Sequence, residues 1–253
     1  MATQTSRKVT SDAHNGAPEH DAAAERPSPI VRGEGLRKVY GEGDAAVEAV
    51  RGVDLELLAG QITVLMGASG SGKSSLLHLL SGLDTPTEGT VWLDGRPMAD
   101  FADAEIARWR ALHMGFVLQQ NNLMPMLTIE ENVAAPLIMA GWRRGKALDR
   151  AGELLSAVGI YERRGHWPSG VSGGEAQRAA VARSCVGEPK VIFADEPTGS
   201  LDSSSGEAVL GIFRDIAKRT GAAALLVTHD QRVAAIGDRI LKVRDGGLEE
   251  CRD

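Results

Sequence analysis

The stretch QITVLMGASGSGKSSLLHLL, residues 61–80, decides the fold. It starts with an apolar run typical of a buried strand, passes through a glycine-rich turn, and ends in a leucine pattern typical of a helix. The turn, GASGSGKS at 67–74, fits the pattern G-x-x-x-x-G-K-[ST]. It also has the strand and helix on either side that this motif requires. The stretch therefore predicts a phosphate-binding loop.

The residue types of this loop suit a nucleotide and its metal ion. Glycines let the backbone N–H groups point inward, where they and the helix N-terminus bind phosphate oxygens. The side chain of Lys73 is expected to reach the terminal phosphates, and the hydroxyl of Ser74 is expected to bind Mg²⁺. The predicted nucleotide-binding residues of the loop are Gly67, Ala68, Ser69, Gly70, Ser71, Gly72, Lys73, Ser74 and Ser75.

Outside this stretch, apolar strands alternate with helices, which predicts an α/β domain around a largely parallel sheet. Between about 120 and 180 we expect helices without strands, a helical insertion. Strands are predicted at 53–58, 61–66, 90–95, 114–119, 190–195, 223–229 and 239–250. Helices are predicted at 74–83, at about 128–164 with interruptions at Gly141, Gly145 and Gly159, after Ser172, and at 204–220.

Polar residues that follow the predicted strands are candidates for catalysis, because ligands of open α/β sheets bind at the carboxyl ends of the strands. Asp195 is expected to hold Mg²⁺, and Glu196 to take a proton from an attacking water. His229 is expected to sense a γ-phosphate at the same edge. Gln119, which ends the strand MGFVLQ, is a candidate for contact with Mg²⁺ or the water. The alternative for the acidic pair is a solvated turn.

A second phosphate cradle is suggested by VSGGEAQRAA, residues 171–180. Ser172 and Glu175 form the pattern of a capping box, which begins a helix. A capping box does not explain Gly173 and Gly174, which weaken a first helical turn. Two residues without side chains let a ligand approach the backbone, so this helix N-terminus is a candidate anion site.

Composition narrows the class of protein. The chain has 253 residues and a net charge of −6, which gives no general footprint for nucleic acid or anionic lipid. No run of about 20 apolar residues occurs, so any membrane crossing is expected to belong to another polypeptide.

The terminal and sulfur-containing residues have ordinary explanations. The polar, alanine-rich segment 1–29 is predicted to be a disordered tail, without a secretory signal, preceding a single domain at 30–253. His14 and His20 are then solvated tail residues rather than metal ligands. Cys185 and Cys251 lie far apart in no metal-like spacing, which favours free thiols in a reducing compartment.

Taken in order, GASGSGKS, Gln119, VSGGE, VIFADE, SLD at 200–202 and His229 resemble the motifs of ATP-binding subunits of ABC transporters. The resemblance covers about residues 30–250. It implies a P-loop NTPase core of the RecA-like kind, an N-terminal antiparallel β subdomain and a helical signature subdomain. It also implies ATP and Mg²⁺ as ligands. In that family two copies pack head to tail, and each signature loop caps the nucleotide of the partner.

Carried over by position, the resemblance assigns a place to each motif residue. Lys73, Ser74, Gln119, Asp195, Glu196 and His229 would act within one subunit. Ser172, Gly173, Gly174 and Glu175 would act across the interface, supported by Asp202. Tyr40 is placed where the family stacks an aromatic ring on adenine. The sequence departs from the family pattern at Leu118, Val171, Glu175 and Ala176, and none of these changes removes a phosphate or metal group.

Three segments, 40–57, 121–133 and 195–202, look most like the subgroup of macrolide-type exporters, lipoprotein-release ATPases and the cell-division ATPase FtsE. This likeness implies an ATPase that drives a separate transmembrane permease from the cytoplasmic face of the membrane, with no nucleic-acid partner. The segment at about 120–140 would grip the permease, although a buried helical core explains its apolar composition equally well. Two alternatives remain: an FtsE-like regulatory ATPase without transport, and a soluble ABC ATPase acting on nucleic acid or ribosomes.

Overall fold

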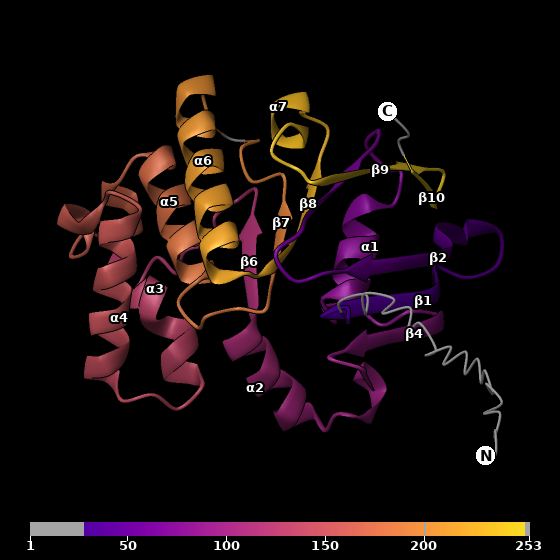
Figure 1. Cartoon of the computed structure of the whole chain (residues 1–253), viewed down its shortest axis with the longest axis horizontal. Helices are drawn as coiled ribbons and strands as arrows, with labels where there is room; N and C mark the ends of the chain where they lie inside the picture. Colours follow the sequence, from indigo (N-terminus) through magenta and orange to yellow (C-terminus); the bar gives the residue numbers. More distant parts are fainter. Residues whose placement is uncertain (1–27, 200, 251–253) are drawn as a thin grey trace, which may run out of the picture.

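The computed structural model describes residues 28–199 and 201–250, and its strands form two sheets (Figure 1). The smaller sheet is antiparallel and has the order β2-β1-β4-β5. Its strands are β1 (Val31–Tyr40), β2 (Val47–Leu57), β4 (Glu88–Leu93) and β5 (Arg96–Pro97).

The larger sheet has six strands in the order β10-β9-β3-β8-β7-β6. All its neighbours pair in parallel except β9 and β10. This arrangement confirms the predicted α/β class, with a largely parallel sheet and an N-terminal antiparallel sheet. The strands are β3 (Ile62–Met66), β6 (Met114–Leu118), β7 (Val191–Asp195), β8 (Ala223–Thr228), β9 (Arg239–Arg244) and β10 (Gly247–Glu250).

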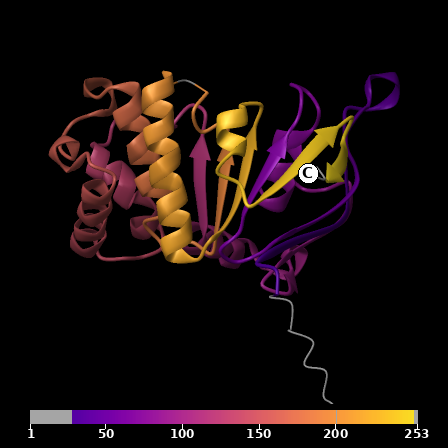
Figure 2. The ribbon, with the colours of Figure 1, turned by 45° about the horizontal axis from the view of Figure 1, so that its top comes forward.

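Helices cover both faces of the parallel strands, and the side chains of each strand alternate between two cores. In β7, Phe193 packs in the core shared with α1 (Lys73–Leu80), whereas Ile192 packs in the core shared with α5 (Gly173–Ser184) and α6 (Ser203–Thr220). Figure 2 shows α6 crossing one face of the sheet, with α1 beyond its other face. The strands are buried on both faces, which explains their unbroken apolar runs.

Between β6 and β7 the chain is helical, with α3 (Ile129–Met139), α4 (Arg144–Ala157), two 3-10 turns (Tyr161–Arg163 and Pro168–Gly170) and then α5. Gly141 and Gly159 lie between helices with positive φ angles, as the expected interruptions require. The interruption expected at Gly145 is wrong, because this residue lies in the first turn of α4. There its N–H needs no partner within the helix, so a glycine costs little.

Several elements differ from the sequence expectation. Strand β2 begins at Val47, six residues before the predicted start, and its alternation is hidden by Gly52, whose φ is 63°. Strand β1 was not predicted, because its register shifts disturb the alternation. Helices α2 (Asp103–His113) and α7 (Gln231–Ala234) were also not predicted. Helix α2 has no fully buried residue and packs only partly buried side chains against the cores, so its apolar stripe is too weak to detect.

Several residues discussed above lie outside the described ranges. They are His14, His20, Cys251 and, up to residue 27, the segment predicted to be disordered. Among the described residues, no helix combines the length and apolar character needed to cross a bilayer.

Candidate active site

The phosphate-binding loop joins the end of β3 to the start of α1, in the predicted context. Its glycines are required by crowding. A Cβ on Gly72, which has a φ of 102°, would lie 2.1 Å from the carbonyl oxygen of Ala49, and one on Gly67 would lie 2.4 Å from that of Val243. The loop is thus pressed against the backbones of β2 and β9. Lys73 is buried, and its Nζ donates to the carbonyl oxygen of Ala68 at 2.8 Å.

One pocket of about 590 Å³ collects most of the predicted catalytic residues. The loop contributes one wall, and the carboxyl ends of three neighbouring parallel strands contribute the other, because β6, β7 and β8 end at the same sheet edge. The predicted residues that line it are Ser69, Gly70, Gly72, Lys73, Ser74, Ser75, Gln119, Asp195, Glu196 and His229. Because these residues come from four separate segments of the chain, 69–75, 119, 195–196 and 229, their convergence is a property of the fold.

The donor set of this pocket fits a magnesium ion. Ser74 supplies a hydroxyl oxygen, Asp195 a carboxylate and Gln119 an amide oxygen, and all three side chains line this pocket. Mg²⁺ takes oxygen ligands and binds through one or two carboxylates together with substrate phosphates. The described residues contain no cluster of three acidic, histidine or cysteine side chains, so an all-protein cage for a metal is absent from them.

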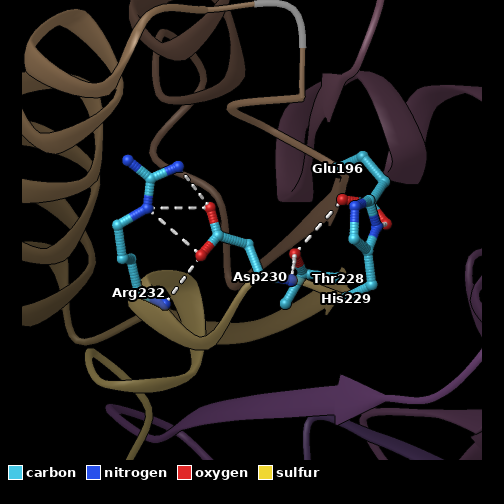
Figure 3. A network of polar contacts seen from close by, with 5 residues as sticks. All are labelled: Glu196, Thr228, His229, Asp230 and Arg232. Atoms are coloured by element: carbon cyan, nitrogen blue, oxygen red, sulfur yellow. Dashed lines mark hydrogen bonds and ion pairs between the residues drawn. The ribbon is translucent and has the colours of Figure 1, made fainter.

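Glu196 has a constrained position just beyond β7. Its φ is 47°, uncommon for a residue with a side chain, and its N–H donates to the carbonyl oxygen of Val227 at 2.9 Å. One carboxylate oxygen, Oε1, lies 2.6 Å from Nδ1 of His229. The other oxygen, Oε2, accepts a hydrogen bond from the hydroxyl of Thr228 at 3.2 Å (Figure 3). Both oxygens of the candidate base are therefore held by the end of β8.

A buried glutamine ties helix α5 to the same pocket. The Nε2 of Gln177 donates to the carbonyl oxygen of Leu118 at 3.1 Å and to that of Pro197 at 2.8 Å. These carbonyls flank Gln119 and Glu196 in the chain. The predicted helix after Ser172 thus holds the backbone beside two candidate catalytic residues.

The predicted second cradle forms the capping box that its sequence indicates. The Oγ of Ser172 accepts from the N–H of Glu175 at 3.2 Å, and the Glu175 carboxylate accepts from the N–H of Ser172 at 2.8 Å. That carboxylate also accepts from Nε of Arg163 at 2.8 Å. The backbone N–H of Ser172 and then Arg163 stabilise the charged form and lower the pKa of Glu175 to about 2.

Asp202 lies beside the second cradle rather than beside the phosphate-binding loop. It caps α6 by accepting from the N–H of Ser205 at 3.0 Å. A Cβ on Gly174 would lie 3.2 Å from the Oγ of the same Ser205, so the first turns of α5 and α6 are adjacent. Hydrogen bonds from Ser204 and from the backbone of Ser205 hold the pKa of Asp202 well below its usual range. Residues 172–175 and Asp202 do not line the pocket.

Tyr40 ends β1 near the start of α1, outside the lining of the pocket. Its hydroxyl donates to Asp84 at 2.8 Å and lies 3.5 Å from the Oγ of Ser75, and the Nζ of Lys38 is 5.0 Å from the ring centre. Tyr40 is 40% exposed. A stacking role on adenine stays a prediction.

Sequence reasoning missed Thr228, Gln177 and Arg163. A signal was available for Thr228, since it precedes His229 at a strand end, but threonine is common in strands. Gln177 stands among alanines on a buried helix face, which is a detectable anomaly. Nothing in the sequence alone joins Arg163 to Glu175, because a loop and a 3-10 turn separate them.

Known proteins that are similar to this chain belong to one family. A family model described as ABC transporter matches residues 50–199. The lipoprotein-releasing system ATP-binding protein LolD of Shewanella frigidimarina is 44% identical over 214 residues, which are 85% of this chain and 90% of that protein. The macrolide export ATP-binding/permease protein MacB of Shigella flexneri is 41% identical over 87% of this chain, which spans only 34% of that longer protein.

A solved structure has the same fold. It is a dimer of an ATP-binding cassette in a post-hydrolysis state, bound to ADP and Pi. Its TM-score against this chain is 0.80, at 36% identity, and the match covers 88% of this chain and 100% of that one.

Proposed function

This chain belongs to the ABC transporter family and is an ATP-hydrolysing subunit of that family, and on this premise we propose that two copies close head to tail around Mg-ATP and drive a separate membrane permease. One observation carries the proposal. The pocket gathers Lys73 and Glu196 of the hydrolytic site, while Ser172 of the second cradle lies outside it. In the proposed pair, the second copy would bring its own Ser172 cradle to the nucleotide in this pocket.

In the proposed hydrolysis, Glu196 takes a proton from a water whose oxygen bonds to the γ-phosphorus. The bond from that phosphorus to the bridging oxygen then breaks, leaving ADP and phosphate. Lys73 orients the terminal phosphates as a fixed positive charge. When bound, Mg²⁺ neutralises phosphate charge, with Ser74, Asp195 and Gln119 as its proposed ligands.

The proposed assembly uses the first turn of α5 across the interface. Gly173 and Gly174 leave the backbone N–H groups open to an incoming phosphate, and the helix dipole favours negative charge there. ATP that contacts both the loop of one copy and the cradle of its partner favours the closed pair, because it binds that state more tightly. Hydrolysis removes the contact and lets the pair open.

Export through the permease of a larger complex is proposed from the relatives, whose names specify lipoprotein release and macrolide export. Exposed apolar side chains in the segment that follows Gln119 in the chain support docking. Met126 is 74% exposed and Met139 is 83% exposed, whereas Ile129 and Val133 of the same segment are buried in the core. The apolar composition at 120–140 thus divides between core and surface. We place the chain at the cytoplasmic face of the membrane through this contact.

The test is the solution mass of the Glu196→Gln variant with and without Mg-ATP. This substitution keeps ATP binding but removes the base, so it is expected to trap the closed pair as a dimer. Ser172→Arg in the same background is expected to abolish the dimer, because it blocks the cradle. The matched control is Gly145→Arg, which adds the same charge at an open helical position.

Two outcomes of these measurements would contradict the proposal. A dimer that persists in the Ser172→Arg variant would show that the second cradle does not bind the nucleotide of the partner. Failure of Lys73→Ala to weaken ATP binding would instead overturn the assignment of the phosphate-binding loop.

A further inference from the structure

Thr228 lies next to the candidate base because of the strand register. In the parallel pair β7 and β8, Asp195 is opposite Val227, and the ladder continues when the N–H of Glu196 donates to the carbonyl oxygen of Val227. The following residue of β8, Thr228, therefore stands directly beside Glu196. Its hydroxyl lies 3.2 Å from Oε2 of that carboxylate (Figure 3).

The direction of this hydrogen bond is fixed by a third group. The N–H of Asp230 donates to the Thr228 hydroxyl oxygen at 3.0 Å, because a backbone N–H can only donate a hydrogen bond. An ionised carboxylate can only accept, so the single hydroxyl proton is directed at Glu196. Thr228 thus acts as a donor fixed at both ends.

The two partners of Glu196 differ in their freedom to move. Thr228 is fully buried, whereas the His229 side chain is 73% exposed. The Nδ1 of His229 lies 2.6 Å from Oε1 of Glu196, but this contact comes from an exposed ring that is free to turn toward a bound phosphate and away from Oε1. Thr228 is expected to keep its contact, because it is fully buried and its hydroxyl oxygen is also held by the N–H of Asp230.

We propose that Thr228 is a positioning residue that holds the Glu196 carboxylate in place while His229 engages the substrate phosphate. The inference rests on the proposed role of Glu196 as the base that accepts a proton from water. A base is effective only within hydrogen-bond reach of that proton, and misplacement by about 1 Å can cost about a hundredfold in rate. Thr228 supplies orientation and does not touch the reacting atoms.

The test compares two variants that separate the hydroxyl from packing. Thr228→Val keeps the buried shape but lacks the hydroxyl, and Thr228→Ser keeps the hydroxyl but lacks a buried methyl. We expect Thr228→Val to lower kcat about tenfold or more while its affinity for ATP stays within about twofold. Thr228→Ser is expected to keep kcat within about threefold, although its melting temperature falls.

A second comparison shows whether Thr228 acts through Glu196. Residues that act as a unit are not additive, so Thr228→Val in the Glu196→Gln background is expected to change the residual rate by less than about twofold. Arg232→Gln is the matched control. It breaks the contacts of Arg232 with Asp230 at 2.7 and 3.0 Å, in the same segment, but leaves the pair of Thr228 and Glu196 intact. Its kcat should therefore be unchanged.

Three results would overturn the proposal. They are a wild-type kcat in Thr228→Val, an equal loss of kcat in Thr228→Ser, and an equal further loss in the Glu196→Gln background. If Thr228→Val does not fold, Thr228→Ala and Thr228→Ser differ only in the hydroxyl, and equal kcat values for them would have the same meaning. Full turnover by Glu196→Gln alone would refute the role of Glu196 itself, and Thr228 would then have no base to position.

Discussion

At the scale of single residues, Gly72 shows how tightly the nucleotide loop is built into the fold. Its left-handed backbone and its approach to the carbonyl of Ala49 each exclude a side chain, for separate reasons. Gly70 provides a useful contrast. It also has a positive φ, of 78°, but a Cβ there would meet nothing within 4 Å. The two positions thus separate backbone strain from collision.

This contrast predicts different stabilities for two alanine variants. Gly70→Ala carries only the left-handed conformation and should lose about 1–2 kcal/mol of unfolding free energy. Gly72→Ala adds a collision with the backbone of β2, and its loss should reach about 2–5 kcal/mol. Urea denaturation of both variants without nucleotide is the measurement. Equal losses would contradict the crowding that the loop geometry implies.

At the scale of elements, α5 has two kinds of attachment. Its first turn is held by the capping box and by Arg163, and its body is held to the pocket. Besides the contacts of Gln177, the guanidinium of Arg183 donates to the carbonyl oxygens of Asn121 and Asn122 at 2.7 and 2.8 Å. The backbone of the segment after Gln119 is therefore held by hydrogen bonds from this helix.

The first turn of α5 gives a prediction in acid. The pKa of Glu175 is lowered from 4.5 to about 2, so its stabilising effect is complete above about pH 4.5 and is lost as the pH falls toward 2. We expect Glu175→Ala to be less stable than the wild type by about 1 kcal/mol at neutral pH, with the difference shrinking over that window. Thermal unfolding at several pH values measures it. A difference that stays constant with pH would contradict the charged cap.

Arg163 contributes part of this shift. The Arg163→Gln variant should show a raised pKa for Glu175, although not its ordinary value, because the N–H of Ser172 remains. Titration of the Glu175 carboxyl carbon by NMR reads the change directly. Arg164→Gln is the control, since Arg164 lies over the Tyr161 ring and contacts its carbonyl instead.

The body of α5 gives a stability prediction. Gln177→Met keeps the length of the side chain but leaves the buried carbonyls of Leu118 and Pro197 without this donor. Such a loss costs about 1–3 kcal/mol, and kcat should fall too, because these carbonyls flank Gln119 and Glu196. The exposed Gln231→Met should stay within about 0.5 kcal/mol of the wild type. Unchanged stability of Gln177→Met would show that α5 is not anchored through this amide.

How far the sequence predicts these elements depends on what each one buries. Strands β3, β6, β7 and β8 were located to within one residue at every end, because strands buried on both faces carry unbroken apolar runs. Helix α2 has no fully buried residue and packs only the partly buried Ile106, Trp109 and Leu112 against the cores, which is too weak a pattern to detect. The candidate site was predictable where motif residues follow strands. The contacts of Gln177 were not, because they join residues 59 and 20 positions apart in the chain.

At the scale of the whole molecule, the two hydrophobic cores lie on opposite faces of the parallel sheet, so we expect them to unfold together. The reactivity of the buried thiol of Cys185 measures this unfolding. Cys185 is 2% exposed at the end of α5, and burial raises the pKa of its thiol from 9.0 to about 11. At a given pH below that range, roughly a hundredfold less thiolate forms than in an ordinary cysteine.

We therefore expect Cys185 to react with iodoacetamide only as fast as the molecule unfolds. Mg-ATP should slow the reaction further, because a ligand that binds only the folded state stabilises it. Peptide mass spectrometry after timed labelling measures this residue separately from Cys251. Rapid labelling in the absence of denaturant would show that α5 detaches from the core locally.

The distance between the pocket and the second cradle within one copy has a genetic consequence. In the proposed head-to-tail pair, each nucleotide site takes Lys73 from one copy and Ser172 from the other. When a Lys73 mutant and a Ser172 mutant are produced together, a mixed pair places both lesions on one site and leaves the opposite site wholly wild type. Two inactive alleles should then complement each other in trans, whereas a single chain bearing both lesions cannot be rescued by a copy of itself.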